Sequence, residues 1–165
     1  MKNRDQSRRK FISTGALALT GLTAFGSQGL DFLQPAQTEK VRVGLIGSGS
    51  RGLGLAQTLA NVRTIELVAC CDIVEEHLKA GLRLADKDAK GYYDYQKLID
   101  DPNVRAVIIA TPLFLHFPMA VAALKAGKHV YVEKPCSHNP AEGEMLVAAA
   151  SKYNRLVQMG NQRRS

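Results

Sequence analysis

The feature that most constrains the fold of this chain is a glycine-rich loop between an apolar run and a helical segment. Gly47, Gly49 and Gly52 occupy the three glycine positions of the pattern G-x-G-x-x-G. Residues 41–46 before the loop have the composition of a short buried strand, and residues 53–62 after it suit a helix. In a strand–loop–helix unit the first glycine allows a tight turn, and the third lets the helix pack closely on the strand.

The same loop predicts a dinucleotide site, because the N–H groups and the dipole at a helix start hold phosphate charge. We include Ser48, Ser50 and Arg51 of the loop among the candidate cofactor contacts. Asp72 lies twenty residues after the last glycine, at the end of the next apolar run, where an acid accepts hydrogen bonds from the adenosine ribose hydroxyls. It would repel a 2′-phosphate, and Ile73 supplies no compensating Arg, so we expect NAD rather than NADP. The alternative is that Asp72 is only a turn residue.

Short apolar runs alternate with helical patterns along the rest of the chain. Near-continuous apolar runs are typical of strands that helices cover on both faces of a sheet. Six strands are expected, at residues 41–46, 65–71, 91–93, 104–110, 129–132 and 156–159. Helical patterns lie between them, at residues 53–62, 74–85, 116–126 and from 139 onward. This alternation predicts an α/β fold with right-handed βαβ units, a doubly wound parallel sheet (Rossmann) spanning residues 41–165.

Two of these helices carry boundary signals. Pro118 lies near the start of an Ala- and Leu-rich segment and Gly127 lies just past its end, the usual positions of these two residues. Asn139, Pro140 and Glu142 open the last helix, with Asn as N-cap, Pro at the first position and Glu at the third.

The first part of the chain differs from the rest. Within residues 1–26, a basic polar stretch precedes an uncharged run of mainly Ala, Leu, Thr and Gly. The sequence S-R-R-K-F-I at residues 7–12 resembles a twin-arginine export signal, an address that a receptor reads. We therefore expect a signal segment at 1–26, a linker at 27–40 and an exported, periplasmic protein that uses the twin-arginine export machinery. A basic tail, or an uncleaved signal that tethers the protein to the membrane, is the alternative.

The net charge of +7 raises nucleic acid as a partner. Five basic residues against one acid fall in the first 26, and the only other concentrated basic group is Arg163 with Arg164. We therefore expect no nucleic acid partner. Three cysteines are too few for a disulfide framework, and no set of His, Cys, Asp and Glu has metal-ligand spacing, so no metal is expected.

Three later segments point to one family. Residues 110–116 read A-T-P-L-F-L-H, residues 126–135 read A-G-K-H-V-Y-V-E-K-P, and residues 157–164 read V-Q-M-G-N-Q-R-R. With the glycine loop, they resemble the Gfo/Idh/MocA oxidoreductases, the group of glucose-fructose oxidoreductase and inositol dehydrogenase. The resemblance covers about residues 41–165, and E-K-P at a strand end is its most specific part.

The resemblance implies roles for individual residues. Thr111, Pro112 and His116 would line the cofactor cleft, and Glu133 would lie near the nicotinamide ribose. Lys134 would lie beside the nicotinamide and a substrate hydroxyl, as the catalytic residue of this chain. His116 has an alternative role as a residue that only flanks a helix.

Two further implications concern the neighbouring loops and the length of the protein. Many family members have Asn where this chain has Leu113, and Pro135 is expected to follow a cis bond. The family also has a second, open-faced α+β domain that carries much of the substrate site. That domain is missing here, so we expect this chain to be a fragment of a longer protein.

The resemblance implies an NAD-dependent dehydrogenase of a sugar, cyclitol or related polyol, working as a homo-oligomer, with Lys134 as an acid/base group. An alternative keeps the fold but uses tightly bound NAD transiently, oxidising a sugar so that a glycosidic bond can be broken. An alternative of another class is a nucleotide-binding sensor that catalyses no reaction.

Overall fold

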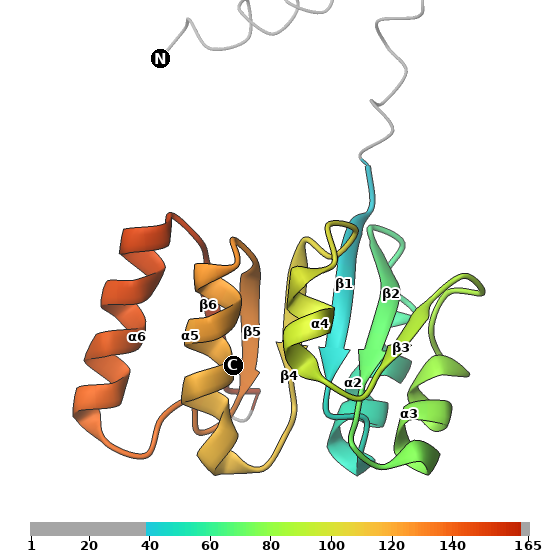
Figure 1. Cartoon of the computed structure of the whole chain (residues 1–165), viewed down its shortest axis with the longest axis horizontal. Helices are drawn as coiled ribbons and strands as arrows, with labels where there is room; N and C mark the ends of the chain where they lie inside the picture. The colour runs from blue at the N-terminus through green and yellow to red at the C-terminus, as the bar shows by residue number, and fades with distance from the viewer. Residues whose placement is uncertain (1–38, 163–165) are drawn as a thin grey trace, which may run out of the picture. The chain divides into compact units, whose positions relative to one another are not determined.

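Six parallel strands form the centre of the structure, a computed structural model that describes residues 39–162. The strands are β1 (Val41–Ile46), β2 (Ile65–Cys71), β3 (Lys90–Tyr92), β4 (Ala106–Ile109), β5 (His129–Glu133) and β6 (Val157–Gly160). Their order across the sheet is β3-β2-β1-β4-β5-β6, and every pairing is parallel (Figure 1). The predicted fold class, a doubly wound sheet of six strands, is confirmed.

The strand order reverses beside β1, which pairs with β2 on one side and β4 on the other. Ile46, the last residue of β1, is in register with Cys71 and Ile109, the last residues of those two neighbours. The loops that follow the three strands therefore leave the sheet at one edge. In open α/β sheets, ligands bind at this switch point, outside the carboxyl ends of the strands.

Helices cover both faces of the sheet. They are α2 (Ser50–Leu59), α3 (Glu75–Leu82), α4 (Tyr95–Asp100), α5 (His116–Lys125) and α6 (Pro140–Tyr153), with a short 3₁₀ turn, η3 (Leu113–Leu115), before α5. The start of α6 was predicted correctly, since the Asn139 side chain accepts from the N–H of Glu142. The short helix α4 was not predicted. Its signal was Asp94, whose side chain caps it by accepting from the N–H of Gln96.

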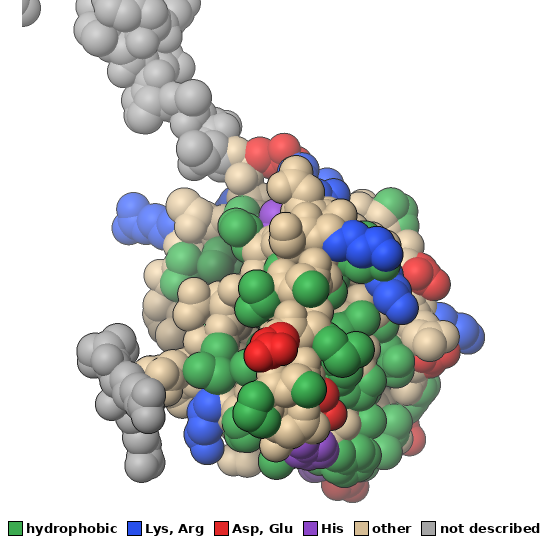
Figure 2. Space-filling view, turned by 90° about the vertical axis from the view of Figure 1, so that its left-hand side faces the viewer, with side chains coloured by type: hydrophobic (Ala, Val, Ile, Leu, Met, Phe, Trp, Pro, Cys, Tyr) green, Lys and Arg blue, Asp and Glu red, His purple; other side chains and the backbone are tan. Residues whose placement is uncertain are grey.

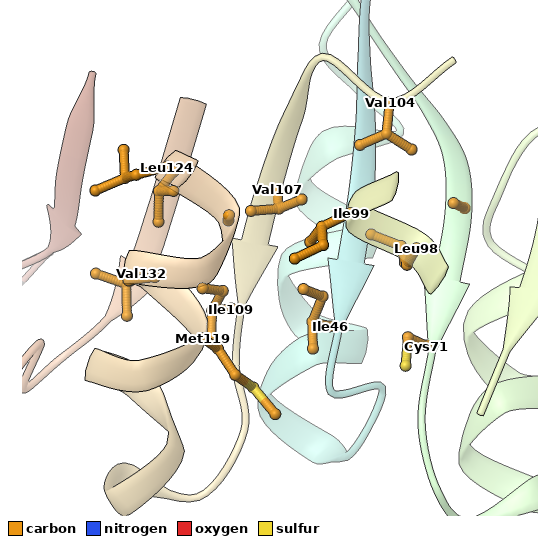
Figure 3. Close-up of a cluster of buried hydrophobic side chains, with 14 of the residues drawn as sticks. Ile46, Cys71, Leu98, Ile99, Val104, Val107, Ile109, Met119, Leu124 and Val132 are labelled. Atoms are coloured by element: carbon orange, nitrogen blue, oxygen red, sulfur yellow. The ribbon is translucent and has the colours of Figure 1, made fainter. Parts of the chain in front are cut away.

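Alternate strand residues face two separate cores. The larger core lies under α4, α5 and α6, where Ile46, Ile109 and Val132 are almost fully buried (Figure 3). The smaller core packs Leu45 of β1 and Cys70 of β2 against α2 and α3. Burial of apolar side chains on both faces stabilises the sheet, at roughly 25 cal/mol per Å² of apolar surface removed from water.

The outer side of the fold is mixed in character. Met145 and Val147 are exposed on α6, and Figure 2 shows apolar side chains interspersed with charged ones on the side of the molecule that α6 covers. Within residues 39–162, no helix has the length and hydropathy needed to cross a membrane. The predicted signal segment and nearly all of the linker lie outside the residues that the structure describes, so they stay predictions.

Candidate functional site

The glycine loop after β1 has the shape that its sequence predicts. Gly47 has a φ of +90°, and a Cβ at this position would lie 2.7 Å from the carbonyl oxygen of Ala110. A Cβ on Gly52 would collide with the carbonyl oxygen of Gly47, whereas one on Gly49 would meet nothing within 4 Å. Two glycines are therefore needed for close backbone packing, and the third leaves open space at the helix start, as a diphosphate requires.

Asp72 follows β2 and is tied to this loop. Its Oδ2 atom accepts from the N–H of Ser48 at 2.8 Å, and its Oδ1 atom accepts from the N–H of Val74 at 2.9 Å. A carboxylate has about four lone-pair positions, so it can accept further hydrogen bonds in this fixed orientation. Ser48 is fully buried, and its side chain faces Gly81 and Cys70. The structure thus gives Ser48 a packing contact, and its contact with a cofactor stays a prediction.

A cavity of about 530 Å³, here called the glycine-loop cavity, lies between these elements. Gly47, Gly49, Ser50, Arg51 and Asp72 line one side of it. Most of its other walls are apolar or aromatic, with Ile46, Ile73, Val74, Tyr93, Tyr95, Pro112, Phe114, Leu115 and Met119. Such a cavity, apolar with a few polar groups, is typical of a small-molecule site.

A second cavity, of about 700 Å³, is here called the lysine cavity. Most of its lining residues are polar or charged, and the full lining is Arg51, Ala110, Thr111, Leu113, His116, Glu133, Lys134, Gly160, Asn161 and Gln162. The two cavities share Arg51, Ala110 and Thr111, so they adjoin. The structure therefore brings the predicted site residues from the loops after β1, β2, β4 and β5 to one edge of the sheet.

An ion pair joins the glycine loop to the end of β5. Arg51 Nη2 lies 2.5 Å from Glu133 Oε1, and the Glu133 side chain is only 6% exposed while that of Arg51 is 46% exposed. The hydrogen bond to Glu133 raises the pKa of Arg51. The other carboxylate oxygen of Glu133 accepts from the N–H of Lys134 at 3.2 Å. The sequence named Arg51 and Glu133 separately as site residues, but it did not reveal that they pair.

Gly160, the last residue of β6, lets this pair pack closely. A Cβ there would lie 2.5 Å from the hydroxyl oxygen of Tyr131 and 2.9 Å from Glu133 Oε1. The pKa of Tyr131 is raised mainly by burial, and the negative charge of Glu133 raises it further. Neither Gly160 nor Tyr131 was identified from the sequence as a site residue. Gly160 meets Glu133 only because β5 and β6 pair.

His116 bridges two of the converging loops. Its ring is buried, with Nδ1 2.8 Å from the carbonyl oxygen of Pro135 and Nε2 2.8 Å from that of Thr111. It is also the first residue of α5, so it both flanks a helix and lines the lysine cavity. The bond between Lys134 and Pro135 is cis, as expected, and the Lys134 side chain is exposed at the cavity.

Lys128, another part of the A-G-K-H-V-Y-V-E-K-P segment, lies away from the site. It is buried, and its Nζ atom donates to the carbonyl oxygens of Asp101 at 2.9 Å and Val104 at 2.7 Å. Burial lowers the pKa of this lysine. The motif therefore combines a structural lysine that holds the end of α4 with the glutamate and lysine that line the cavity.

The parallel sheet, the glycine loop and the acid after β2 together define a dinucleotide-binding Rossmann domain. Residues 41–161 match the model of the "Oxidoreductase family, NAD-binding Rossmann fold". The chain therefore belongs to the Gfo/Idh/MocA oxidoreductases and contains their NAD-binding domain. This confirms the family and the cofactor that the sequence predicted.

Relatives with names from two enzyme classes are similar to this chain. Inositol 2-dehydrogenase of Salmonella typhimurium is 40% identical over 126 residues, which cover 75% of this chain and 38% of the relative. A glycosyl hydrolase family 109 protein of Solibacter usitatus is 29% identical over 170 residues, covering 94% of this chain and 39% of the relative. The chain thus spans about two-fifths of the length of these relatives.

Solved structures show the same likeness. The crystal structure of scyllo-inositol dehydrogenase from Lactobacillus casei, with bound NAD(H) and scyllo-inositol, has a TM-score of 0.70 and 26% sequence identity. The match covers 76% of this chain and 37% of that one.

Proposed function

We propose that this chain is the nucleotide-binding part of an NAD-dependent dehydrogenase that acts on a cyclitol, sugar or related polyol. One observation carries the proposal: the cavity that contains Lys134 adjoins the cavity formed by the glycine loop and Asp72. A cofactor that extends from the glycine-loop cavity into the lysine cavity would bring its reactive end to Lys134, the one lysine among the described residues that line these two cavities. The relatives named as inositol dehydrogenases support the cyclitol class.

The residues present fit NAD. The open space at Gly49 and the start of α2 would take the diphosphate, and Asp72 would accept from the adenosine ribose. Thr111 and Glu133 would border the nicotinamide half, because both line the lysine cavity. When bound, NAD accepts a hydride from the substrate carbon or returns one to it.

Lys134 would supply the acid/base chemistry of this chain. Lys134 directly follows the end of β5, and both of its chain neighbours are held in place. Arg51 pairs with Glu133, and the His116 ring contacts the carbonyl oxygen of Pro135. A cation at this place stabilises negative charge on the substrate oxygen and can pass the hydroxyl proton onward. Residues beyond this chain would complete the substrate site.

The test is steady-state turnover by the complete enzyme with and without added NAD. With inositols and other polyols we expect reduced cofactor to form in proportion to the product. If no polyol or sugar alcohol supports cofactor reduction, while NAD still binds the chain, the dehydrogenase proposal is wrong although the nucleotide site is real.

A second candidate function is glycoside cleavage with NAD retained by the enzyme. It is favoured by the relatives named as glycosyl hydrolase family 109 proteins, one of which aligns over 94% of this chain. In the same assay this candidate predicts cleavage of a glycoside with no added cofactor and no net change in NAD.

We propose that NAD binds more tightly than NADP, by about 1–2 kcal/mol, the scale of an unsatisfied or repelled charged hydrogen bond. Asp72, whose orientation is fixed by two backbone N–H groups, supports this preference. Calorimetric titration of the chain with each nucleotide measures it. Equal affinity would contradict the role given to Asp72.

We also propose that the protein is exported to the periplasm by the twin-arginine route, on the pattern S-R-R-K-F-I at residues 7–12. A reporter fused after residue 40 should cross the membrane, and changing Arg8 and Arg9 together to Lys should stop it. Export that continues in the double variant would favour a general secretory signal or a membrane tether. That the complete enzyme forms a homo-oligomer also stays a prediction.

A further inference from the structure

His77, a residue to which the sequence gave no role, lies beside the acid that reads the ribose. It belongs to α3, and its Nδ1 atom is 3.6 Å from Asp72 Oδ1. Its side chain is 51% exposed and lines the glycine-loop cavity together with Asp72. His77 is five residues beyond the strand-end acid, and the first turn of α3 folds it back toward that position.

The distance between His77 Nδ1 and Asp72 Oδ1 decides what kind of contact the two side chains can form. At 3.6 Å the imidazole and the carboxylate are too far apart for a hydrogen bond, but they are close enough for an ion pair if the ring is protonated. Asp72 is fixed by the N–H groups of Ser48 and Val74, and its side chain is only 10% exposed. The half-exposed imidazole is therefore the partner with more freedom, and its charge controls the electrostatic field at the acid.

We propose that His77 is a second residue that determines cofactor specificity, a step that rests on the proposed NAD site. A neutral imidazole leaves the charge of Asp72 uncompensated, so that a 2′-phosphate is repelled. An imidazolium neutralises that charge and offers a cation to the phosphate. The preference for NAD over NADP then falls as the pH falls from about 8 to about 5.5, the range in which histidines change charge.

Other charged and titratable groups lie on α3 and on the elements near it, and they do not remove this effect. They are Glu75, Glu76 and Lys79 on α3, Arg51 on α2, Cys71 in β2, Tyr93 and Asp94 between β3 and α4, and Tyr95, the first residue of α4. Glu75 is paired with Lys79 at 2.6 Å, and Arg51 is paired with Glu133. Burial raises the pKa of Cys71 to about 12, so this thiol is uncharged in the relevant range. The acid within ion-pair distance of His77 is Asp72.

The experiment is calorimetric titration of the chain with NAD and with NADP at pH 8 and pH 5.5, in the natural protein and in His77→Asn. The variant is essential because the 2′-phosphate itself takes up a proton near pH 6, as phosphate monoesters do. That change is common to both proteins, so the difference between them isolates His77. His77→Gln is a second variant of different length, and circular dichroism checks that each variant is folded.

We expect the ratio of the NADP to the NAD dissociation constant to fall about tenfold more in the natural protein than in His77→Asn between the two pH values, the effect of about one charge-assisted hydrogen bond. Equal falls in both proteins, or no fall in either, would overturn the role of His77 and leave the NAD site intact. Failure of both nucleotides to bind at either pH would overturn the proposed function, and this inference with it.

Discussion

The two adjoining cavities are built in different ways. The glycine-loop cavity is lined by glycine backbone and apolar side chains, and its acid is held by nearby backbone N–H groups. The lysine cavity depends on contacts between distant segments, above all the Arg51–Glu133 pair, whose members are 82 residues apart in sequence. One half of the site is therefore set by backbone shape and the other by charge. Substitutions in each cavity should therefore separate the effect of backbone shape from that of charge.

The largest effect is expected in the lysine cavity. Lys134→Met keeps most of the side-chain length and removes the charge, so turnover of the complete enzyme should fall by roughly 10²–10⁴-fold, the usual range for one acid/base group. The affinity for NAD should change little, because the glycine-loop cavity is unaltered. Rate measurements and nucleotide titration on the same preparation test both halves of the claim. Turnover within a few-fold of the natural enzyme would reduce Lys134 to a solvated surface residue.

Backbone shape should dominate in the other cavity. Gly47→Ala forces a side chain into a positive φ and against the carbonyl oxygen of Ala110, so we expect a loss of about 1–3 kcal/mol in unfolding free energy and weaker NAD binding. Gly54→Ala is the matched control, because Gly54 lies in α2 and a Cβ there meets nothing. This control should stabilise the chain by up to about 1 kcal/mol. Urea denaturation compares the two, and equal effects would contradict the explanation.

The Arg51–Glu133 pair connects the two cavities and can be tested as a cycle. Arg51→Met leaves the buried carboxylate of Glu133 without its cation, which costs about 3–5 kcal/mol for a fully buried pair. Because Arg51 is half exposed, we expect a smaller loss of about 1–2 kcal/mol in unfolding free energy. Adding Glu133→Gln to this variant should recover most of the loss. Additive losses in the double variant would mean that the two side chains act independently.

The smallest expected effect concerns the thiols. Cys70 and Cys71 are buried, and burial raises the pKa of each to about 12, whereas Cys136 is only partly buried. Ellman's reagent at pH 8 should therefore modify one thiol per native chain quickly and the other two only on unfolding, because the thiolate is the reactive form. Fast reaction of Cys71 would show that the glycine-loop cavity opens to solvent more than the structure indicates. A Cys136→Ser variant assigns the reactive thiol.

The pattern of the sequence was enough to predict much of the fold. All six strands were placed within about two residues of their ends, and the capping residues of α6 were identified, because strand hydrophobicity and helix caps are local signals. The helix α4 was missed because it is six residues long and too short for a helical period to appear. Its aspartate cap was the one usable signal.

The glycine loop, the acid Asp72 and the position of Lys134 at a strand end could all be predicted from the order of the residues, since each depends on neighbours within a few residues or on a fixed spacing. That Arg51 pairs with Glu133 and that Gly160 must lack a side chain became visible only in the folded structure. These relations depend on strand pairing and helix packing, which bring together residues with no common local pattern. Local patterns can be recognised in the order of the residues, whereas contacts between charges from distant segments form only when the sheet has assembled.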